Sequence, residues 1–303
     1  MIENISLFFI KRCKCTCTVT ERTIFGIVSS CAGIILNILM FILKLTASAF
    51  SGSVAAAVDA VHNLTDSASS LVTLLGFIFC AQPETERYPM GKGRIEYIAG
   101  FIVSVVLISA GTELAKTSVS RIINPATVTF SGVSLIMLII SFAVKLYMAF
   151  YSSRIAKKIS SEALKAAAAD CLCDSFSTLI ALAAMAILPF TSFNADAWGG
   201  LAVSVFILFT GLKSAKETLN LLAGENADKA TLCEVRRIFE ANFAEAEICR
   251  IVLHDYGPCN RIIDVSVTVC TACDAAYIAK KQTELSRLLK ASAGVHLALT
   301  LTE

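Results

Sequence analysis

The chain has 303 residues, of which 56% are hydrophobic and 17% are charged, and its mean hydropathy is +0.71. Soluble domains carry about 25% charged residues, so this composition excludes an ordinary water-soluble protein. The formal net charge of +2 gives no basis for nucleic-acid binding.

The apolar residues are unevenly distributed along the chain. Long uncharged runs fill the first 222 residues, and an ordinary soluble composition returns after them. We therefore predict three regions. They are a cytosolic N-terminal arm at 1–22, a transmembrane domain at 23–222 and a cytosolic C-terminal domain at 223–303.

Six segments of the transmembrane domain are long and apolar enough to cross a bilayer, which takes roughly 20 residues. The predicted spans are 23–43, 54–80, 97–116, 122–144, 163–188 and 197–212, the last running on toward Leu222. The predicted fold class is a membrane all-α protein with six transmembrane helices, followed by a small α+β domain.

Lysine and arginine residues of the short loops indicate the orientation, because they concentrate on the cytosolic side. Basic residues are dense before the first span and between spans two and three and spans four and five, and sparse elsewhere. Both termini are therefore expected in the cytosol. We expect a multi-pass protein of the plasma membrane.

The C-terminal region has the pattern of a small mixed domain. Helical periodicity marks 229–243 and 275–291, and strand-like alternation marks 247–254, 261–269 and 295–301. The order αββαβ predicts a sheet with helices on one face.

Ionisable residues inside spanning helices are costly, so they predict function. The second span carries Asp59, His62 and Asp66, whose spacings of three and four residues place them on one helical stripe. The fifth span carries Asp170 and Asp174, one turn apart. Neighbouring carboxylates in a membrane repel each other unless a cation lies between them.

These side chains predict a divalent-metal site. His62, Asp66, Asp170 and Asp174 offer one imidazole and three carboxylates, a set that suits Zn²⁺ and also Mn²⁺, Fe²⁺ or Cd²⁺. Asp59 is either a hydrogen-bonding partner of His62 or a residue of the water boundary. No prosthetic group is expected. Polar contacts across a helix bundle are the structural alternative.

Cysteines suggest weaker metal sites. Cys270 and Cys273 have the C-x-x-C spacing of zinc and redox sites, and His254 can complete them. The clustered thiols of Cys13, Cys15 and Cys17 can bind a soft metal or can belong to a reduced arm without a role.

Several of these motifs resemble the cation diffusion facilitator family. They are 51–67 (SGSVAAAVDAVHNLTDS) in the second span, 89–96 (PMGKGRIE) in the next loop, 169–174 (ADCLCD) in the fifth span and 254–258 (HDYGP) in the tail. In the most similar branch, asparagine often replaces His62 and manganese is the common substrate. His62 shifts the expected preference toward zinc. The loop carries Tyr88 and Lys92 where relatives often carry histidines, so a loop metal site is not expected.

The resemblance implies a homodimer in the lipid bilayer with a ferredoxin-like cytosolic domain. It also implies export of divalent metal ions from the cytosol in exchange for protons, with His62, Asp66, Asp170 and Asp174 as ligands. The chain is then not an enzyme. Two other classes remain as alternatives: an intramembrane aspartyl protease, although its G-x-G-D motif is absent, and a non-transporting metal sensor or scaffold.

Overall fold

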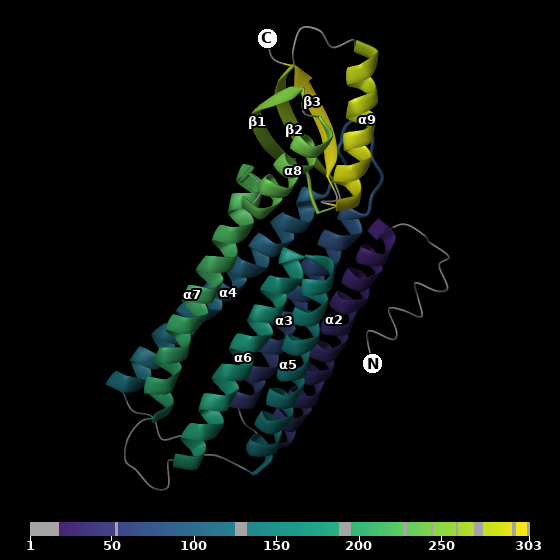
Figure 1. Cartoon of the computed structure of the whole chain (residues 1–303). Coiled ribbons are helices and arrows are strands. Elements are labelled where there is room, and N and C mark those ends of the chain that lie inside the picture. Colours follow the sequence, from purple (N-terminus) through teal and green to yellow (C-terminus); the bar gives the residue numbers. More distant parts are fainter. Residues whose placement is uncertain are drawn as a thin grey trace. The chain divides into compact units, whose positions relative to one another are not determined.

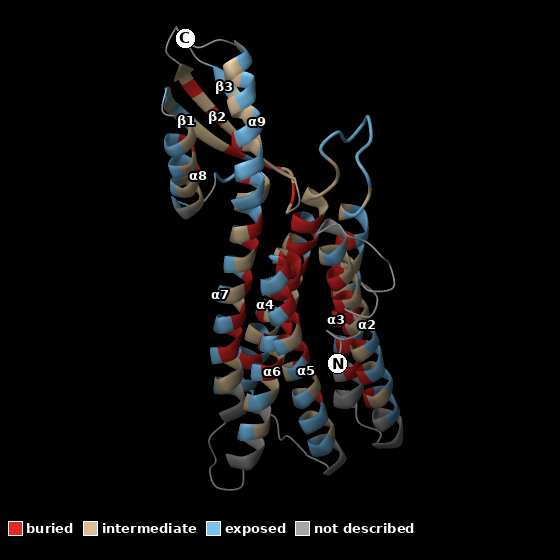
Figure 2. Ribbon diagram, turned by 45° about the vertical axis from the view of Figure 1, so that its right-hand side comes forward, coloured by how far each residue is buried: buried red, intermediate tan, exposed pale blue. Residues whose placement is uncertain are grey.

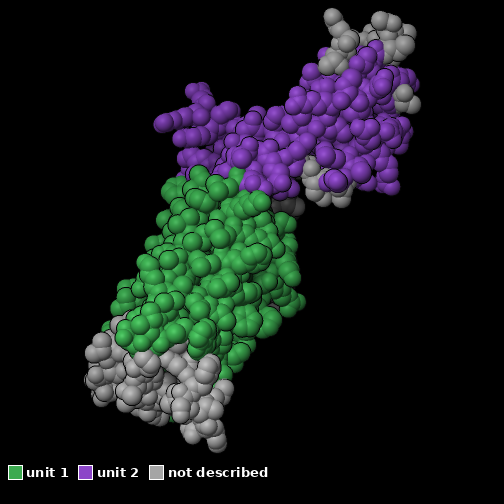
Figure 3. Space-filling view, turned by 90° about the vertical axis from the view of Figure 1, so that its left-hand side faces the viewer, with its two compact units in different colours: residues 1–81, 96–219 green, residues 82–95, 220–303 purple. Residues whose placement is uncertain are grey.

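A computed structural model describes residues 18–51, 54–124, 132–187, 195–226, 229–243, 245–258, 260–269, 275–292 and 295–301 of the chain. The chain forms two compact units (Figure 3). One unit joins residues 1–81 with 96–219, and the other joins 82–95 with 220–303.

The first unit is built from long helices that run alongside one another (Figure 1). Their bounds are α2 (Thr18–Ser51), α3 (Val54–Cys80), α4 (Arg94–Ile123), α5 (Gly132–Ile159), α6 (Glu162–Ile187) and α7 (Ala195–Ala223). Helix α2 packs against α3 and α5, and α6 packs against α5 and α3.

Five of these helices, among the described residues, are long and apolar enough to cross a membrane. The candidate spans are Glu21–Thr46, Ala60–Cys80, Arg94–Ile123, Leu135–Ile159 and Trp198–Ala223. The protein is therefore a multi-pass membrane protein. Helix α6 coincides with the predicted fifth span but is not one of these five, so the six-span topology remains a prediction.

The helix that corresponds to the predicted fourth span, 122–144, begins and ends later in the chain, at Gly132 and Ile159. Helix α4 runs on to Ile123, just before the Asn124-Pro125 step, where the residue preceding a proline is disfavoured in a helix. Helix α5 then extends to Ile159 through several basic residues and ends before Ser160, whose φ is +50°. The hydropathy pattern predicted that the span ends at Val144, because the basic residues at 145, 154, 157 and 158 are more typical of a loop.

The exposed residues of this unit lie on the sides of the helices that face away from their neighbours (Figure 2), and many of them are large and apolar. Large exposed side chains include Ile35, Phe150, Val205 and Phe209. Beside large apolar side chains such as Phe77, the helix contacts bury many small and polar residues, such as Ser104, whose hydroxyl donates to Ser214 at 2.8 Å. Small and hydroxyl side chains are enriched at such contacts in bilayers, because lipid gives helices no hydrophobic reason to associate.

A buried ion pair joins α2 to α4. Two guanidinium nitrogens of Arg22 donate to the two carboxylate oxygens of Glu96 at 2.6 and 2.7 Å, and Glu96 is 0% exposed. The Nε of Arg22 donates to the carbonyl oxygen of Ile159 at 2.9 Å. One arginine thus joins three helices near the ends of α2 and α5.

The second unit contains the predicted αββαβ order: α8 (Lys229–Asn242), β1 (Ala246–Asp255), β2 (Arg261–Val269), α9 (Ala275–Ser292) and β3 (His296–Leu301). Its described strands form one sheet in the order β1-β2-β3, antiparallel between β1 and β2 and parallel between β2 and β3. The alternating residues Ile263, Val265 and Val267 are fully buried against leucines of α9 and aromatic residues of the α8 segment. The predicted pattern of elements is therefore confirmed, within one or two residues at each end.

The loop between α3 and α4 belongs to this second unit. Arg94 donates from Nε to the carbonyl oxygen of Asp255 at 2.8 Å, and its guanidinium lies 4.8 Å from the centre of the Tyr256 ring. The side-chain amide of Asn260 donates to the carbonyl oxygen of Met90 at 3.0 Å. Loop 82–95 is thus bonded to the turn between β1 and β2.

Candidate metal site

Three of the four predicted ligands come together between α3 and α6. Their ligand atoms, one each from His62, Asp66 and Asp174, all lie within 4.8 Å of one another. The Nε2 of His62 is 4.0 Å from Oδ1 of Asp66 and 3.5 Å from Oδ1 of Asp174. The i, i+4 spacing of His62 and Asp66 gives both side chains one helical face, and α3 presents that face to α6.

The cluster combines a buried part with an open one. The side chains of Asp66 and Asp174 are 8% and 18% exposed, and that of His62 is 47% exposed. Two carboxylates and one imidazole in this arrangement can bind a divalent cation, which neutralises anions that the apolar surroundings disfavour. The exposed imidazole leaves the cluster accessible from one side.

Asp170, the fourth predicted ligand, lies outside this group of three. It is buried, and it lines a small cavity of about 20 Å³ together with Asp66. Polar side chains of α2 and α3, among them Ser29, Asn37 and Thr73, share the lining with residues of α5 and α6 such as Met148 and Leu164. The cavity has room for about one water molecule, which the polar part of the lining can bind.

A lysine that the sequence reasoning did not single out completes the cluster. Lys145 of α5 places its Nζ 2.5 Å from Oδ2 of Asp66 and 2.8 Å from Oδ2 of Asp174. Its side chain is only 4% exposed. A signal was present in the sequence, since Lys145 is the only charged residue between Ser131 and Ser153.

Other predicted candidates are not brought into the cluster by the described residues. Asp59 belongs to α3, but its side chain lies outside the described part of the structure. His254 is exposed on β1 of the second unit, and Cys270 and Cys273 lie outside the described residues. The arm with Cys13, Cys15 and Cys17 is also outside them.

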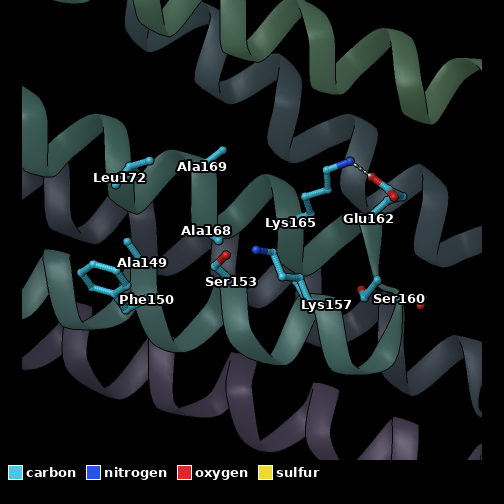
Figure 4. Close-up of a pocket in the computed structure, with 12 residues that line it drawn as sticks. Ala149, Phe150, Ser153, Lys157, Ser160, Glu162, Lys165, Ala168, Ala169 and Leu172 are labelled. Carbon is cyan, nitrogen blue, oxygen red and sulfur yellow. Dashed lines mark ion pairs between the residues drawn. The ribbon is translucent and has the colours of Figure 1, made fainter.

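A separate surface pocket of about 570 Å³ lies between α5 and α6 (Figure 4). Its lining includes Lys157 and Lys165, and Lys165 forms an ion pair with Glu162 at 3.3 Å. None of the three clustered ligands lines it. Two ammonium groups in the described lining disfavour a divalent cation in this pocket.

The comparison with protein families now identifies the membrane unit. Residues 30–223 match the model of the cation efflux transmembrane domain, a segment that contains α3, α5 and α6 with all four predicted ligands. The chain belongs to the cation efflux family. Members of this family, also called cation diffusion facilitators, are transporters and not enzymes.

Individual relatives are similar over the same part of the chain. A protein of Methanocaldococcus jannaschii named only as an uncharacterized transporter is 26% identical over 64% of this chain and 68% of its own length. A probable cation efflux system protein of Mycobacterium tuberculosis is 30% identical over 64% of this chain and 60% of its own. The cation-efflux pump FieF of Citrobacter koseri is 24% identical over 63% of this chain and 64% of its own.

Family membership confirms the resemblance found in the motifs and places the chain in a family of cation transporters. The chain spans less than two thirds of the length of the mycobacterial and Citrobacter relatives. The comparisons lend no support to an aspartyl protease or to a metal sensor without transport.

Proposed function

We propose that this cation efflux transporter exports a divalent metal ion, Zn²⁺ or Mn²⁺, from the cytosol. The convergence of His62, Asp66 and Asp174 within 4.8 Å carries the proposal. One imidazole nitrogen and two carboxylate oxygens from two helices match the ligand types of both ions, and also accept Fe²⁺ or Cd²⁺.

Asp170 is the proposed fourth ligand. It lies one helical turn from Asp174, and it lines a cavity with Asp66, so a small movement of α6 relative to α3 brings it to the ion. Binding of a divalent cation favours such a movement, because the ion attracts a carboxylate that is buried in the membrane unit.

Proton exchange is the proposed source of energy. The ligands must lose their protons to bind metal, so acid on the far side of the membrane promotes release. A site that opens alternately to the two sides then exchanges metal for protons with the same side chains. Histidine suits this exchange, since its unperturbed pKa lies near physiological pH.

The proposed architecture has six spans, with α6 as the fifth and both termini in the cytosol, in the plasma membrane. The distribution of lysine and arginine residues supports this orientation. The αββαβ order supports a ferredoxin-like cytosolic domain, and family resemblance suggests a homodimer. The proposed domain limits are 1–22, 23–222 and 223–303.

The test is uptake of Mn²⁺ and Zn²⁺ by proteoliposomes that contain the purified chain, with an imposed pH gradient. A lumen more acidic than the bath is expected to accelerate uptake, and Asp174→Ala is expected to abolish it. Glu234→Gln, an exposed residue of α8, is the control with unchanged uptake. Uptake that persists in Asp174→Ala contradicts the site, and uptake that ignores the gradient contradicts proton exchange.

A further inference from the structure

Lys145 and His62 contact opposite oxygens of the same two carboxylates. The Oδ1 atoms of Asp66 and Asp174 are the ones nearest to His62, whereas both Oδ2 atoms bind Nζ of Lys145. The lysine comes from α5, which contributes no predicted ligand. One ammonium group therefore bridges the metal-binding faces of α3 and α6.

A buried lysine at this depth requires a reason. A charged side chain inside a spanning helix is costly, and Lys145 has apolar neighbours on α5, such as Val144 and Met148. Leucine or methionine at this position avoids that cost. However, without a cation, Asp66 and Asp174 carry like charges in close proximity, and Asp170 adds a third carboxylate nearby.

We propose that Lys145 is a tethered counter-ion of the transport site, which holds the two carboxylates together when no metal is bound and weakens the binding of the divalent ion. This inference rests on the proposed function, since it assigns a role to a residue of that same site. Lys145 is thus an affinity-setting residue and not a metal ligand, because its ammonium group has no lone pair to donate.

Two opposing effects follow from one geometry. The ammonium orients both carboxylates toward His62, which favours metal binding by preorganisation. It also places a positive charge within a few ångströms of a divalent cation, which opposes binding. The repulsion dominates for two reasons. The Coulomb energy between the ammonium of Lys145 and a divalent cation is twice that between two single charges, and the buried surroundings screen it poorly. Removal of the charge is therefore expected to tighten metal binding.

A weaker site benefits a transporter. An ion that binds three carboxylates and an imidazole without opposition leaves slowly, and slow release limits turnover. After release of the metal, the ammonium of Lys145 again compensates the charges of Asp66 and Asp174. The empty site can then open again to the cytosol with less uncompensated charge inside the membrane.

The experiment measures Mn²⁺ affinity by equilibrium dialysis and Mn²⁺ uptake in proteoliposomes for Lys145→Met, Lys145→Gln and Lys145→Arg. For Met and Gln we expect affinity at least about tenfold tighter and slower maximal uptake. Arg keeps the charge and is expected to resemble the parent. Lys165→Met, an exposed lysine of α6 that pairs with Glu217, is the matched control without effect.

Weaker or unchanged affinity in folded Lys145→Met or Lys145→Gln overturns the counter-ion role, as does an Arg variant that behaves like Met. Gel filtration verifies folding, and the nearly isosteric Gln variant keeps the test valid where Met does not fold. Asp174→Ala separates the two proposals. If Asp174→Ala retains Mn²⁺ binding, the proposed metal site itself is wrong. If Asp174→Ala loses binding but the Lys145 variants bind Mn²⁺ with the affinity of the parent, the metal site stands and only the counter-ion role of Lys145 is rejected.

Discussion

Asp174 of α6 accepts a hydrogen bond from Lys145 of α5 through one oxygen, at 2.8 Å, while its other oxygen lies 3.5 Å from His62 of α3. One carboxylate therefore connects three helices at the candidate metal site. Removal of this group disturbs both the ligand set and its compensating charge.

Asp174→Asn is the mildest test of that connection. The amide keeps the size of the side chain but loses the negative charge that attracts a divalent cation. We expect Mn²⁺ uptake to fall by at least about a hundredfold, which corresponds to roughly 2.7 kcal/mol or more. Initial rates in proteoliposomes measure it. Uptake within about threefold of the parent would remove Asp174 from the ligand set.

His62 is expected to set the preference among metals. Imidazole suits Zn²⁺, whereas oxygen ligands suit Mn²⁺. His62→Asn is therefore expected to weaken Zn²⁺ handling by at least about tenfold and Mn²⁺ handling much less. Competition between the two ions in the same uptake assay measures the change. An equal loss for both ions contradicts the role of the imidazole.

The pair of Arg22 and Glu96 provides a test of stability. Glu96→Gln removes the carboxylate that accepts two hydrogen bonds from the partly buried guanidinium of Arg22. Breaking one side of a buried pair typically costs about 3–5 kcal/mol. We expect a clear fall in the thermal unfolding temperature in detergent.

The double variant Arg22→Met with Glu96→Leu is the matched control for this pair. It removes both charges, so a large part of the lost stability is expected to return. If the double variant is as unstable as Glu96→Gln, the loss comes from packing and not from the broken ion pair.

Gly93 tests the connection between loop 82–95 and the β1–β2 turn. A Cβ atom at Gly93 would lie 2.7 Å from the carbonyl oxygen of Tyr256 and 2.9 Å from Cα of Gly257, and both neighbours are backbone atoms. Gly93→Ala is therefore expected to loosen the loop, at a cost of about 1–3 kcal/mol. Faster trypsin cleavage after Arg87 measures it.

Met90→Ala is the control for the loop, since the side chain of Met90 is exposed. It leaves the hydrogen bond from Asn260 to the backbone oxygen of Met90 in place. Equal cleavage of the two variants would show that the loop is held by other contacts.

Most of the secondary structure could be predicted from the sequence. In the C-terminal unit, period-two alternation at Ile263, Val265 and Val267 predicted a half-buried strand, because apolar residues at every second position share one face. The spans were less exact at their ends. A lysine such as Lys145 stops a hydropathy window, although a paired lysine can continue a helix.

The candidate site was partly predictable for a related reason. Spacing along one helix places His62 beside Asp66, but it does not say which helix faces them. The ligand pattern does not predict Lys145, because metal ligands are groups that bind a cation, whereas this residue is itself a cation. Its partners, Asp66 and Asp174, became evident only when α5 was packed against α3 and α6.

The most direct test of the transport site is equilibrium dialysis of the purified chain against Mn²⁺, an ion that thiolates bind weakly, so the twelve cysteines interfere little. We predict saturable binding of one ion per chain that disappears in both Asp66→Ala and Asp174→Ala and persists in Glu234→Gln. Unchanged binding in either aspartate variant would contradict a metal site shared between α3 and α6.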